Sequence, residues 1–164
     1  MLTIAKFDRC DVVNNPLSDR PSFTIWFSGC TFKCEDCYNE ALWNKEYGEE
    51  YSAKIVSMYV ESSCNKLNVD DVVFLGGEPL QQDRGELLYL CKLLSKARKK
   101  IWIYTGYDFD VVKNEYSDIL EYAYTVKCGR YDKNLKQYGF PASSNQKVYR
   151  KINNSWREIK MIGG

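Results

Sequence analysis

The chain has 164 residues, 45% of them hydrophobic and 15% aromatic, and its net charge is +1 from 23 Lys and Arg against 22 Asp and Glu. This composition predicts a packed globular protein and excludes a disordered tail, which lacks the apolar residues for a core. The near-neutral charge gives no field that would attract nucleic acid, so we expect no nucleic-acid partner. The length favours a single domain, residues 1–164, that buries about 70% of the surface of the unfolded chain.

The cysteine count and the first residues bear on location. Seven cysteines are an odd number, and they lack the regular even spacing of a secreted disulfide scaffold. The first ten residues include Lys6, Asp8 and Arg9 and so lack the apolar core of a signal peptide. No window approaches the ~18 apolar residues of a membrane span. We therefore expect a cytoplasmic protein with no membrane partner.

The first half of the chain reads as strands, loops and one helix. Residues 2–7 predict an edge strand, and residues 11–21, rich in Asn, Pro and Ser, predict a loop. Residues 22–27 predict a strand that ends just before three closely spaced cysteines. Ser52 is the expected N-cap of a helix that runs to about residue 66. Its apolar positions recur at helical spacing: Ile55, Val56, Tyr59 and Val60.

The second half alternates strands and helices. Residues 72–75 are a continuous apolar run, as in a buried parallel strand, and residues 101–104 and 123–128 predict two more strands. A helix with a basic end is expected from its apolar spacing: Leu87, Leu90, Cys91 and Leu94. Residues 109–122 predict a third helix, and residues 147–150 a last strand. Cys64 and Cys91 lie on helical apolar stripes, so we expect both in the core.

This alternation favours an α/β fold in which strands pair in parallel through right-handed crossovers. A complete eight-unit barrel takes about 250 residues. The shorter chain therefore predicts an open, partial (β/α) barrel of mostly parallel strands. Cys30, Gly76, Thr105 and Cys128 each lie at or just beyond the end of a predicted strand, so their loops should meet at the edge of the barrel where such enzymes place their chemistry.

The cysteines after the second strand have the spacing C-x3-C-x2-C: Cys30, Cys34 and Cys37. Thiolates on one short loop select zinc, copper(I) or an iron-sulfur cluster. A structural zinc site takes four protein ligands, whereas this chain has no histidine and its other four cysteines stand alone. The pattern favours a metal centre with one open position, and zinc stays as the alternative.

The same spacing resembles the signature of the radical S-adenosylmethionine enzymes. The string Cys34-Glu35-Asp36-Cys37-Tyr38-Asn39 is similar to one branch of that family, the activating proteins of the anaerobic ribonucleoside-triphosphate reductase. Leu42-Trp43-Asn44, Gly48 and Gly76-Gly77-Glu78-Pro79 extend this resemblance, which covers about residues 12–150. The Gly-Gly-Glu-Pro string alone is also an ordinary turn after a strand.

The resemblance implies two cofactors and the residues that bind them. Cys30, Cys34 and Cys37 would hold a 4Fe-4S cluster, whose open iron chelates S-adenosylmethionine. Gly76, Gly77 and Glu78 would bind the amino group of the methionine end. Further contacts are expected from Tyr38, from Thr105 and from Asn145, which lies in the segment of residues 144–146. No catalytic side chain is assigned.

The resemblance also implies an oxidoreductase that cleaves S-adenosylmethionine reductively. The resulting 5′-deoxyadenosyl radical would generate a glycyl radical on the large subunit of the reductase. The other expected partner is a low-potential electron donor such as a flavodoxin. Alternatives are an activase of another glycyl-radical enzyme, a deazaguanine-forming synthase, and a non-enzymatic iron-sulfur or zinc module.

Two positions depart from the family pattern. Cys128 stands where relatives often carry an acidic residue, and its role is open, including that of a hydrogen relay. Residues 14–20 replace a glycine-rich stretch of relatives, so we expect that loop to be shaped differently.

Overall fold

The protein is described by a computed structural model that covers residues 1–11 and 21–160, with side chains for residues 1–8 and 21–160. Residues 12–20 of the loop expected at residues 11–21, with the departure from relatives at residues 14–20, therefore lie outside the described residues, as does the side chain of Cys10. Residue 11 of that predicted loop is instead the last residue of the first strand.

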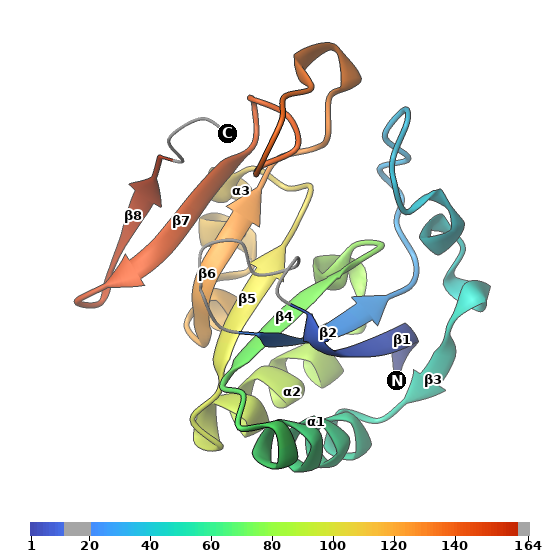
Figure 1. Cartoon of the computed structure of the whole chain (residues 1–164), viewed down its shortest axis with the longest axis vertical. Helices are drawn as coiled ribbons and strands as arrows, with labels where there is room; N and C mark the ends of the chain where they lie inside the picture. The colour runs from blue at the N-terminus through green and yellow to red at the C-terminus, as the bar shows by residue number, and fades with distance from the viewer. Residues whose placement is uncertain (12–20, 161–164) are drawn as a thin grey trace.

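The described chain forms one mixed sheet with helices against it (Figure 1). The strand order is β3-β1-β2-β4-β5-β6-β7-β8. The strands are β1 (Leu2–Asp11), β2 (Ser22–Phe27), β3 (Glu49–Tyr51), β4 (Asp71–Gly76), β5 (Lys100–Tyr104), β6 (Ala123–Cys128), β7 (Lys147–Ile152) and β8 (Ser155–Ile159). The helices are α1 (Ala53–Leu67), α2 (Arg84–Lys96), α3 (Phe109–Glu115) and α4 (Ser117–Leu120), with four short 3-10 turns at Glu40–Trp43, Lys45–Tyr47, Pro79–Gln81 and Lys133–Leu135.

The sheet corrects the expectation of mostly parallel strands. Only the central strands β2, β4, β5 and β6 pair in parallel, and the outer pairs in the described part of the chain are antiparallel. The β7–β8 hairpin shows why: Asn153 and Asn154 both have left-handed φ, 51° and 62°. Such a two-residue turn joins antiparallel strands, whereas a parallel crossover needs a dozen residues or more. The result is a single open sheet, and its closure into a partial barrel stays a prediction.

The predicted strand at residues 2–7 is longer than expected and is not at the edge. It lies between β2 and the short strand β3, which the apolar pattern missed. The strand β3 reads Glu-Glu-Tyr, and it carries no apolar run that periodicity could detect. Its place at the edge comes from pairing Leu2 with Tyr51, a contact between distant parts of the sequence.

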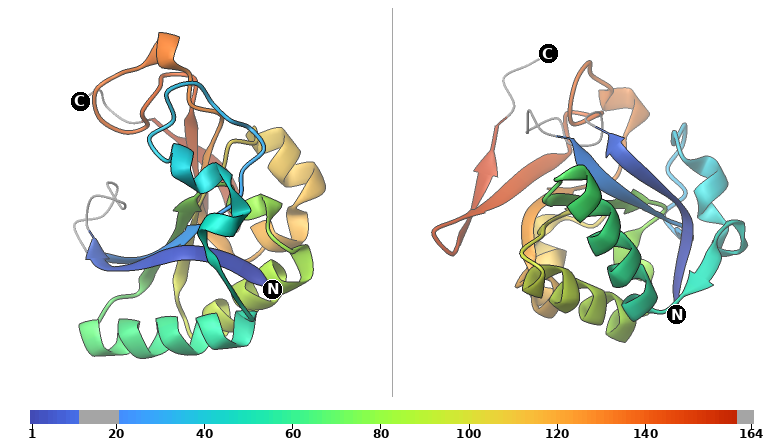
Figure 2. Two further views of the ribbon diagram at one scale, coloured as in Figure 1. Left: turned by 90° about the vertical axis from the view of Figure 1, so that its right-hand side faces the viewer. Right: turned by 60° about the horizontal axis from the view of Figure 1, so that its bottom comes forward.

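Helices cover one face of the sheet (Figure 2). Ser52 caps α1 as predicted, since its hydroxyl accepts the N–H of Ile55 at 3.3 Å. The buried side of α1 differs from the predicted stripe: Val56 and Val60 are buried, but Ile55 is 55% exposed and Tyr59 39%. The prediction for the cysteines is confirmed, because Cys64 and Cys91 are both fully buried among the core residues.

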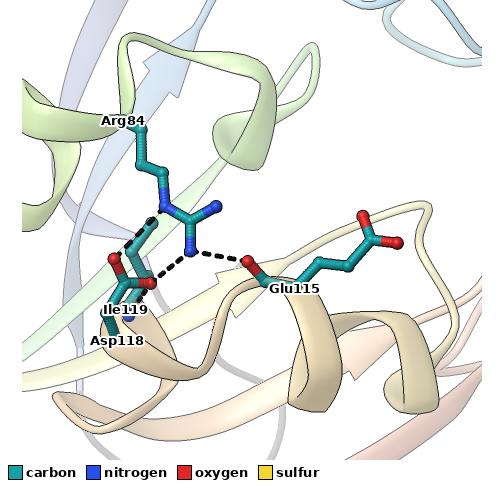
Figure 3. Close-up of polar contacts among 4 residues, drawn as sticks. All are labelled: Arg84, Glu115, Asp118 and Ile119. Carbon is teal, nitrogen blue, oxygen red and sulfur yellow. Dashed lines mark hydrogen bonds and ion pairs between the residues drawn. The ribbon is translucent and has the colours of Figure 1, made fainter.

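The single helix predicted at residues 109–122 is broken in two at Tyr116, whose φ of −125° is not helical. Arg84 on α2 bridges the break (Figure 3). Its guanidinium donates to both carboxylate oxygens of Asp118, at 2.8 and 3.2 Å, and to the carbonyl of Glu115 at the end of α3. A long-range ion pair therefore stabilises an interruption of the helix that local helical spacing did not predict.

The opposite face of the sheet has its own apolar cluster, made only of strand residues. Val73, Leu75 and Trp102 are buried there, with Trp26, Tyr104 and Tyr124 packed around them. Both faces of the central strands are therefore apolar, which explains the continuous apolar run in β4. Within residues 1–11 and 21–160, no helix is long and apolar enough to span a bilayer.

Candidate functional site

The carboxyl ends of the parallel strands β2, β4, β5 and β6 share one edge of the sheet (Figure 1). The loops that begin with Ser28, Gly77, Thr105 and Gly129 follow these ends directly, and the first of them carries Cys30. The convergence predicted from the sequence is confirmed, and the order of parallel strands is its cause.

The cysteine loop, residues 28–39, is fixed at its root and turns sharply along its length. The N–H of Gly29 donates to Leu42 O at 2.7 Å, and that of Cys30 donates to Trp43 O at 3.1 Å. Farther along, Lys33 and Asp36 both have left-handed φ, and the N–H of Cys37 closes a turn onto Cys34 O. These turns bring the second and third cysteines close together.

The three cysteines are free thiols, and two of them, Cys30 and Cys37, line one cavity at this edge. Burial raises the pKa of Cys30, and burial and then the charge of Cys37 raise the pKa of Cys34. Because thiolates are the ligands, metal binding here would release protons.

The donor set of this loop fits a 4Fe-4S cluster. Thiolate ligands with one open iron match three cysteines and no histidine. Among the residues that the structure describes, no three Cys, Asp or Glu side chains are gathered closely enough to hold one metal ion. A cluster spreads its thiolate ligands over separate irons, so it does not need that close gathering.

The two glycines after β4 allow the cysteine loop to lie directly against them. A Cβ on Gly76, whose φ is +116°, would meet Phe27 O at 2.3 Å, and one on Gly77 would meet Gly29 O at 2.6 Å. Because the two segments approach so closely, the N–H of Glu78 can donate a hydrogen bond to Gly29 O, at 2.9 Å. The Gly-Gly pair therefore holds the cysteine loop against the end of β4.

Glu78, the residue after the Gly-Gly pair, is buried, and only 1% of it is exposed. Its Oε1 accepts the N–H of Leu80 at 3.0 Å, and its Oε2 accepts the N–H of Gly106 at 2.7 Å. Burial raises the pKa of Glu78 to about 7, although these hydrogen bonds and one with Thr105 favour the carboxylate. The carboxyl group is thus held rigidly between the loops after β4 and β5, and it lines the cavity beside Cys30.

The remaining predicted contacts lie at different distances from the cavity. Tyr38 lines it but is 73% exposed, with its ring 6.0 Å from that of Tyr131. Thr105 is buried and contacts Glu78. Asn145 lines a second cavity together with Cys128, and its amide donates to Arg130 O. Burial raises the pKa of Cys128 to about 12, which keeps that thiol protonated.

Sequence reasoning missed several residues that line the first cavity: Phe32, Leu75, Tyr104, Lys127 and Gln146. The alternation of side chains along a strand was the available signal for Lys127. Since Cys128 is buried among the core residues on the helix-covered face, its neighbour Lys127 must point to the other face.

Phe32 connects the cysteine loop to the far side of the cavity. Its ring meets that of Tyr107 edge-on at 4.8 Å, and the Arg130 guanidinium lies 4.4 Å from its centroid. A Cβ on Gly106 would collide with the same ring at 2.6 Å. An ion pair between Glu35 and Lys133 adds a second link. The loop after β2 is thereby joined to the loops after β5 and β6.

Comparison with known proteins agrees with this arrangement. Residues 20–149 match the family described as 4Fe-4S single cluster domain. The anaerobic ribonucleoside-triphosphate reductase-activating protein of enterobacteria phage T4 is 32% identical over 153 residues, 90% of this chain and 94% of the relative. The protein of the same name from Escherichia coli K12 is 26% identical over 148 residues, 85% of this chain and 92% of the relative.

Among solved structures, QueE from Escherichia coli is similar over 64% of this chain and 52% of its own, with a TM-score of 0.48 and 22% identity. The family match and the phage relative both cover most of the chain, including the three cysteines and the Gly-Gly-Glu segment. The chain therefore belongs to the family of anaerobic ribonucleoside-triphosphate reductase-activating proteins.

Proposed function

We propose that this chain is a radical S-adenosylmethionine activase that generates a glycyl radical on the large subunit of the anaerobic ribonucleoside-triphosphate reductase. The observation that carries the proposal is the cavity at the carboxyl edge of the sheet, where Cys30 and Cys37 face the buried carboxyl of Glu78. Family membership supports the choice of the reductase as partner.

In this proposal, Cys30, Cys34 and Cys37 hold a 4Fe-4S cluster. When bound, the cluster and S-adenosylmethionine together supply a strong hydrogen-atom acceptor, the 5′-deoxyadenosyl fragment released by one-electron cleavage of the sulfonium. The segment Gly76-Gly77-Glu78 receives the amino group of the cofactor, because a fixed carboxylate with free lone pairs attracts an ammonium group. Tyr38, Thr105 and Asn145 are the proposed outer contacts.

The protein surroundings orient the cofactor and limit the access of other hydrogen donors. Hydrogen bonds and a ring contact tie the cysteine loop to the loops after β4 and β5, so contacts within the protein fix its position at the cavity. We propose that the open sheet forms part of a (β/α) barrel, within a single domain, and that a loop of the large subunit reaches this cavity. A low-potential donor such as a flavodoxin supplies the electron. The free thiols of the described cysteines favour a reducing compartment, and we place the protein in the cytoplasm.

The test is release of 5′-deoxyadenosine from S-adenosylmethionine by the anaerobically reconstituted, dithionite-reduced protein. We expect release by the wild type and none by Cys34→Ser. Bound zinc in place of iron, or iron without release even with the large subunit present, would contradict the proposal. The partner is tested by electron paramagnetic resonance, which should detect a glycyl radical on the large subunit after mixing. A competent cluster without that signal would favour another glycyl-radical enzyme as the substrate.

A further inference from the structure

The connection between β6 and β7, residues 129–146, is far longer than the two strands require. These strands are antiparallel neighbours, and the next antiparallel pair, β7 and β8, is joined by only Asn153 and Asn154. Loops longer than about 12–15 residues in a compact domain usually serve a function. We call this segment the β6–β7 loop, and its extra length is not explained by joining the strands.

The β6–β7 loop is braced by its own hydrogen bonds. Gln137 holds its two sides together, since its backbone N–H donates to Ala142 O at 3.0 Å and its side-chain amide donates to Pro141 O at 2.9 Å. Nearer the sheet, the N–H of Ser144 donates to Leu135 O at 2.9 Å. The tip of the loop, residues 138–140, is therefore presented on a defined support.

This tip exposes an aromatic side chain. Tyr138 is 89% exposed, the highest value among the large hydrophobic side chains that the structure describes, and Leu135 of the same loop is 43% exposed. Gly139, with a left-handed φ of 91°, turns the chain directly after the tyrosine. Packing of the fold does not account for a tyrosine in this position. In protein interfaces, tyrosine is among the residues that contribute most binding energy, because it offers a large contact area with few rotatable bonds.

The β6–β7 loop also forms one side of the cavity at the carboxyl edge of the sheet. Tyr131 and Ala142 of this loop line the cavity together with Tyr38 of the cysteine loop. Both loops rise from the same edge of the sheet (Figure 1), and an ion pair between Glu35 and Lys133 joins them. A protein that inserts a segment into this cavity therefore approaches along the exposed tip.

We propose that the tip of the β6–β7 loop, with Tyr138 as its anchor, is a docking surface for the large subunit of the reductase. The inference rests on the proposed function and deepens it, because it names the surface that meets the protein substrate. The reacting glycine belongs to a protein and has to enter the cavity, so contacts beside the cavity select that protein without touching the cofactors. The facing surface of the large subunit should offer an apolar pocket with a hydrogen-bond acceptor, which is the chemistry that fits a phenol.

The experiment measures two affinities of the anaerobically reconstituted protein by isothermal titration calorimetry, without reductant so that no turnover occurs. One is the affinity for the purified large subunit, and the other is the affinity for S-adenosylmethionine alone. Both are measured for the wild type, Tyr138→Ser and Tyr138→Phe. Tyr89→Ser is the matched control, since Tyr89 is a 45% exposed tyrosine on α2 that does not line this cavity.

We expect Tyr138→Ser to weaken binding of the large subunit about 10- to 30-fold and to leave the affinity for S-adenosylmethionine unchanged. Tyr138→Phe keeps the ring and should lose only about 2- to 5-fold, and Tyr89→Ser should bind like the wild type. An unchanged affinity of Tyr138→Ser for the large subunit, or an equal loss in Tyr89→Ser, would overturn the inference. Weaker binding of S-adenosylmethionine by Tyr138→Ser would also overturn it, since the tyrosine would then act on the cofactor site.

The wild type separates failure of this inference from failure of the proposed function. If the wild type does not bind the large subunit, the proposed function is wrong and the docking surface with it. If the wild type binds and activates the large subunit and Tyr138→Ser does so equally well, the proposed function stands and only the docking surface is wrong.

Discussion

Gln81 holds Thr31 through both ends of its side-chain amide. The N–H of Thr31 donates to Gln81 Oε1 at 2.9 Å, and Gln81 Nε2 donates to Thr31 Oγ1 at 2.8 Å. The same nitrogen reaches the hydroxyl of Tyr107 at 3.3 Å. One side chain thus joins the loops that follow β2, β4 and β5, immediately beside Cys30.

Replacing Gln81 by Met should therefore loosen the cysteine loop. The hydrogen bonds are exposed, so we expect the free energy of unfolding to fall by only about 1 kcal/mol. A double-mutant cycle with Thr31→Val in urea unfolding should give a coupling energy of similar size. Gln137→Met, which removes a hydrogen bond to Pro141 O elsewhere, is the control and should show no coupling to Thr31. Additive effects of Gln81→Met and Thr31→Val would contradict the expectation.

Gly77→Ala should damage the same junction more severely. The new methyl group would meet two backbone oxygens, Gly29 O at 2.6 Å and Leu42 O at 2.8 Å, and backbone cannot move aside cheaply. We expect a loss of about 1–3 kcal/mol in unfolding free energy and less bound iron after reconstitution. Gly85→Ala, in helix α2, has its nearest neighbour at 3.6 Å and should instead stabilise the protein by about 1 kcal/mol. If both variants behave alike, the close approach at Gly77 does not constrain the loop.

The cysteines should divide into two classes by iron content. Substitution of Cys30, Cys34 or Cys37 by Ala should remove most of the iron bound after anaerobic reconstitution, because each would ligate a separate iron. Cys64→Ala and Cys91→Ala should keep the iron and cost about 1 kcal/mol of stability, since both thiols are core groups. Iron and sulfide analysis with thermal unfolding distinguishes the classes. Full iron in Cys34→Ala would be incompatible with the proposed centre.

The buried carboxyl of Glu78 predicts a pH dependence of stability. Its pKa is about 7 in the folded protein against an ordinary value of 4.5, so between these values the unfolded chain releases a proton that the folded chain keeps. The contribution of this carboxyl group to the free energy of unfolding is fully present below about pH 4.5. It falls as the pH rises toward 7, by up to about 3 kcal/mol. Urea unfolding at several pH values should show this slope in the wild type. Glu78→Gln should lack it, and an identical slope in that variant would assign it to other groups.

The ion pair of Arg84 with Asp118 should contribute to stability and not to cofactor binding. Both side chains are well exposed, so Arg84→Met should cost no more than about 1 kcal/mol and leave the iron content unchanged. The hydrogen bond from Arg84 lowers the pKa of Asp118, so this contribution is present at neutral pH and disappears as the pH falls below the ordinary value of 3.8. Asp118→Asn should remove the acid-dependent part. A loss of iron in either variant would show that the break between α3 and α4 influences the distant site.

Local patterns in the sequence were sufficient for most of the central elements. Periodicity and capping located β2 and β6 at their observed bounds, the start of α1 at Ser52, and Cys64 and Cys91 in the core. These features depend on neighbours within a few residues, or on burial of one apolar side of a helix. The antiparallel outer strands, the short strand β3 and the break at Tyr116 depend on pairing and ion pairs between distant segments, and periodicity does not contain them.

The candidate site divides in the same way. The sequence by itself determined the ligand chemistry, because three thiols at fixed spacing and the Gly-Gly-Glu segment are written in consecutive residues. Only the tertiary structure decided which residues surround them. It placed Lys127 in the cavity and Asn145 in a neighbouring one, and it used Gln81 to hold the cysteine loop. The physical reason is that strand order, register and the face of each side chain set these distances, and they result from packing the whole sheet.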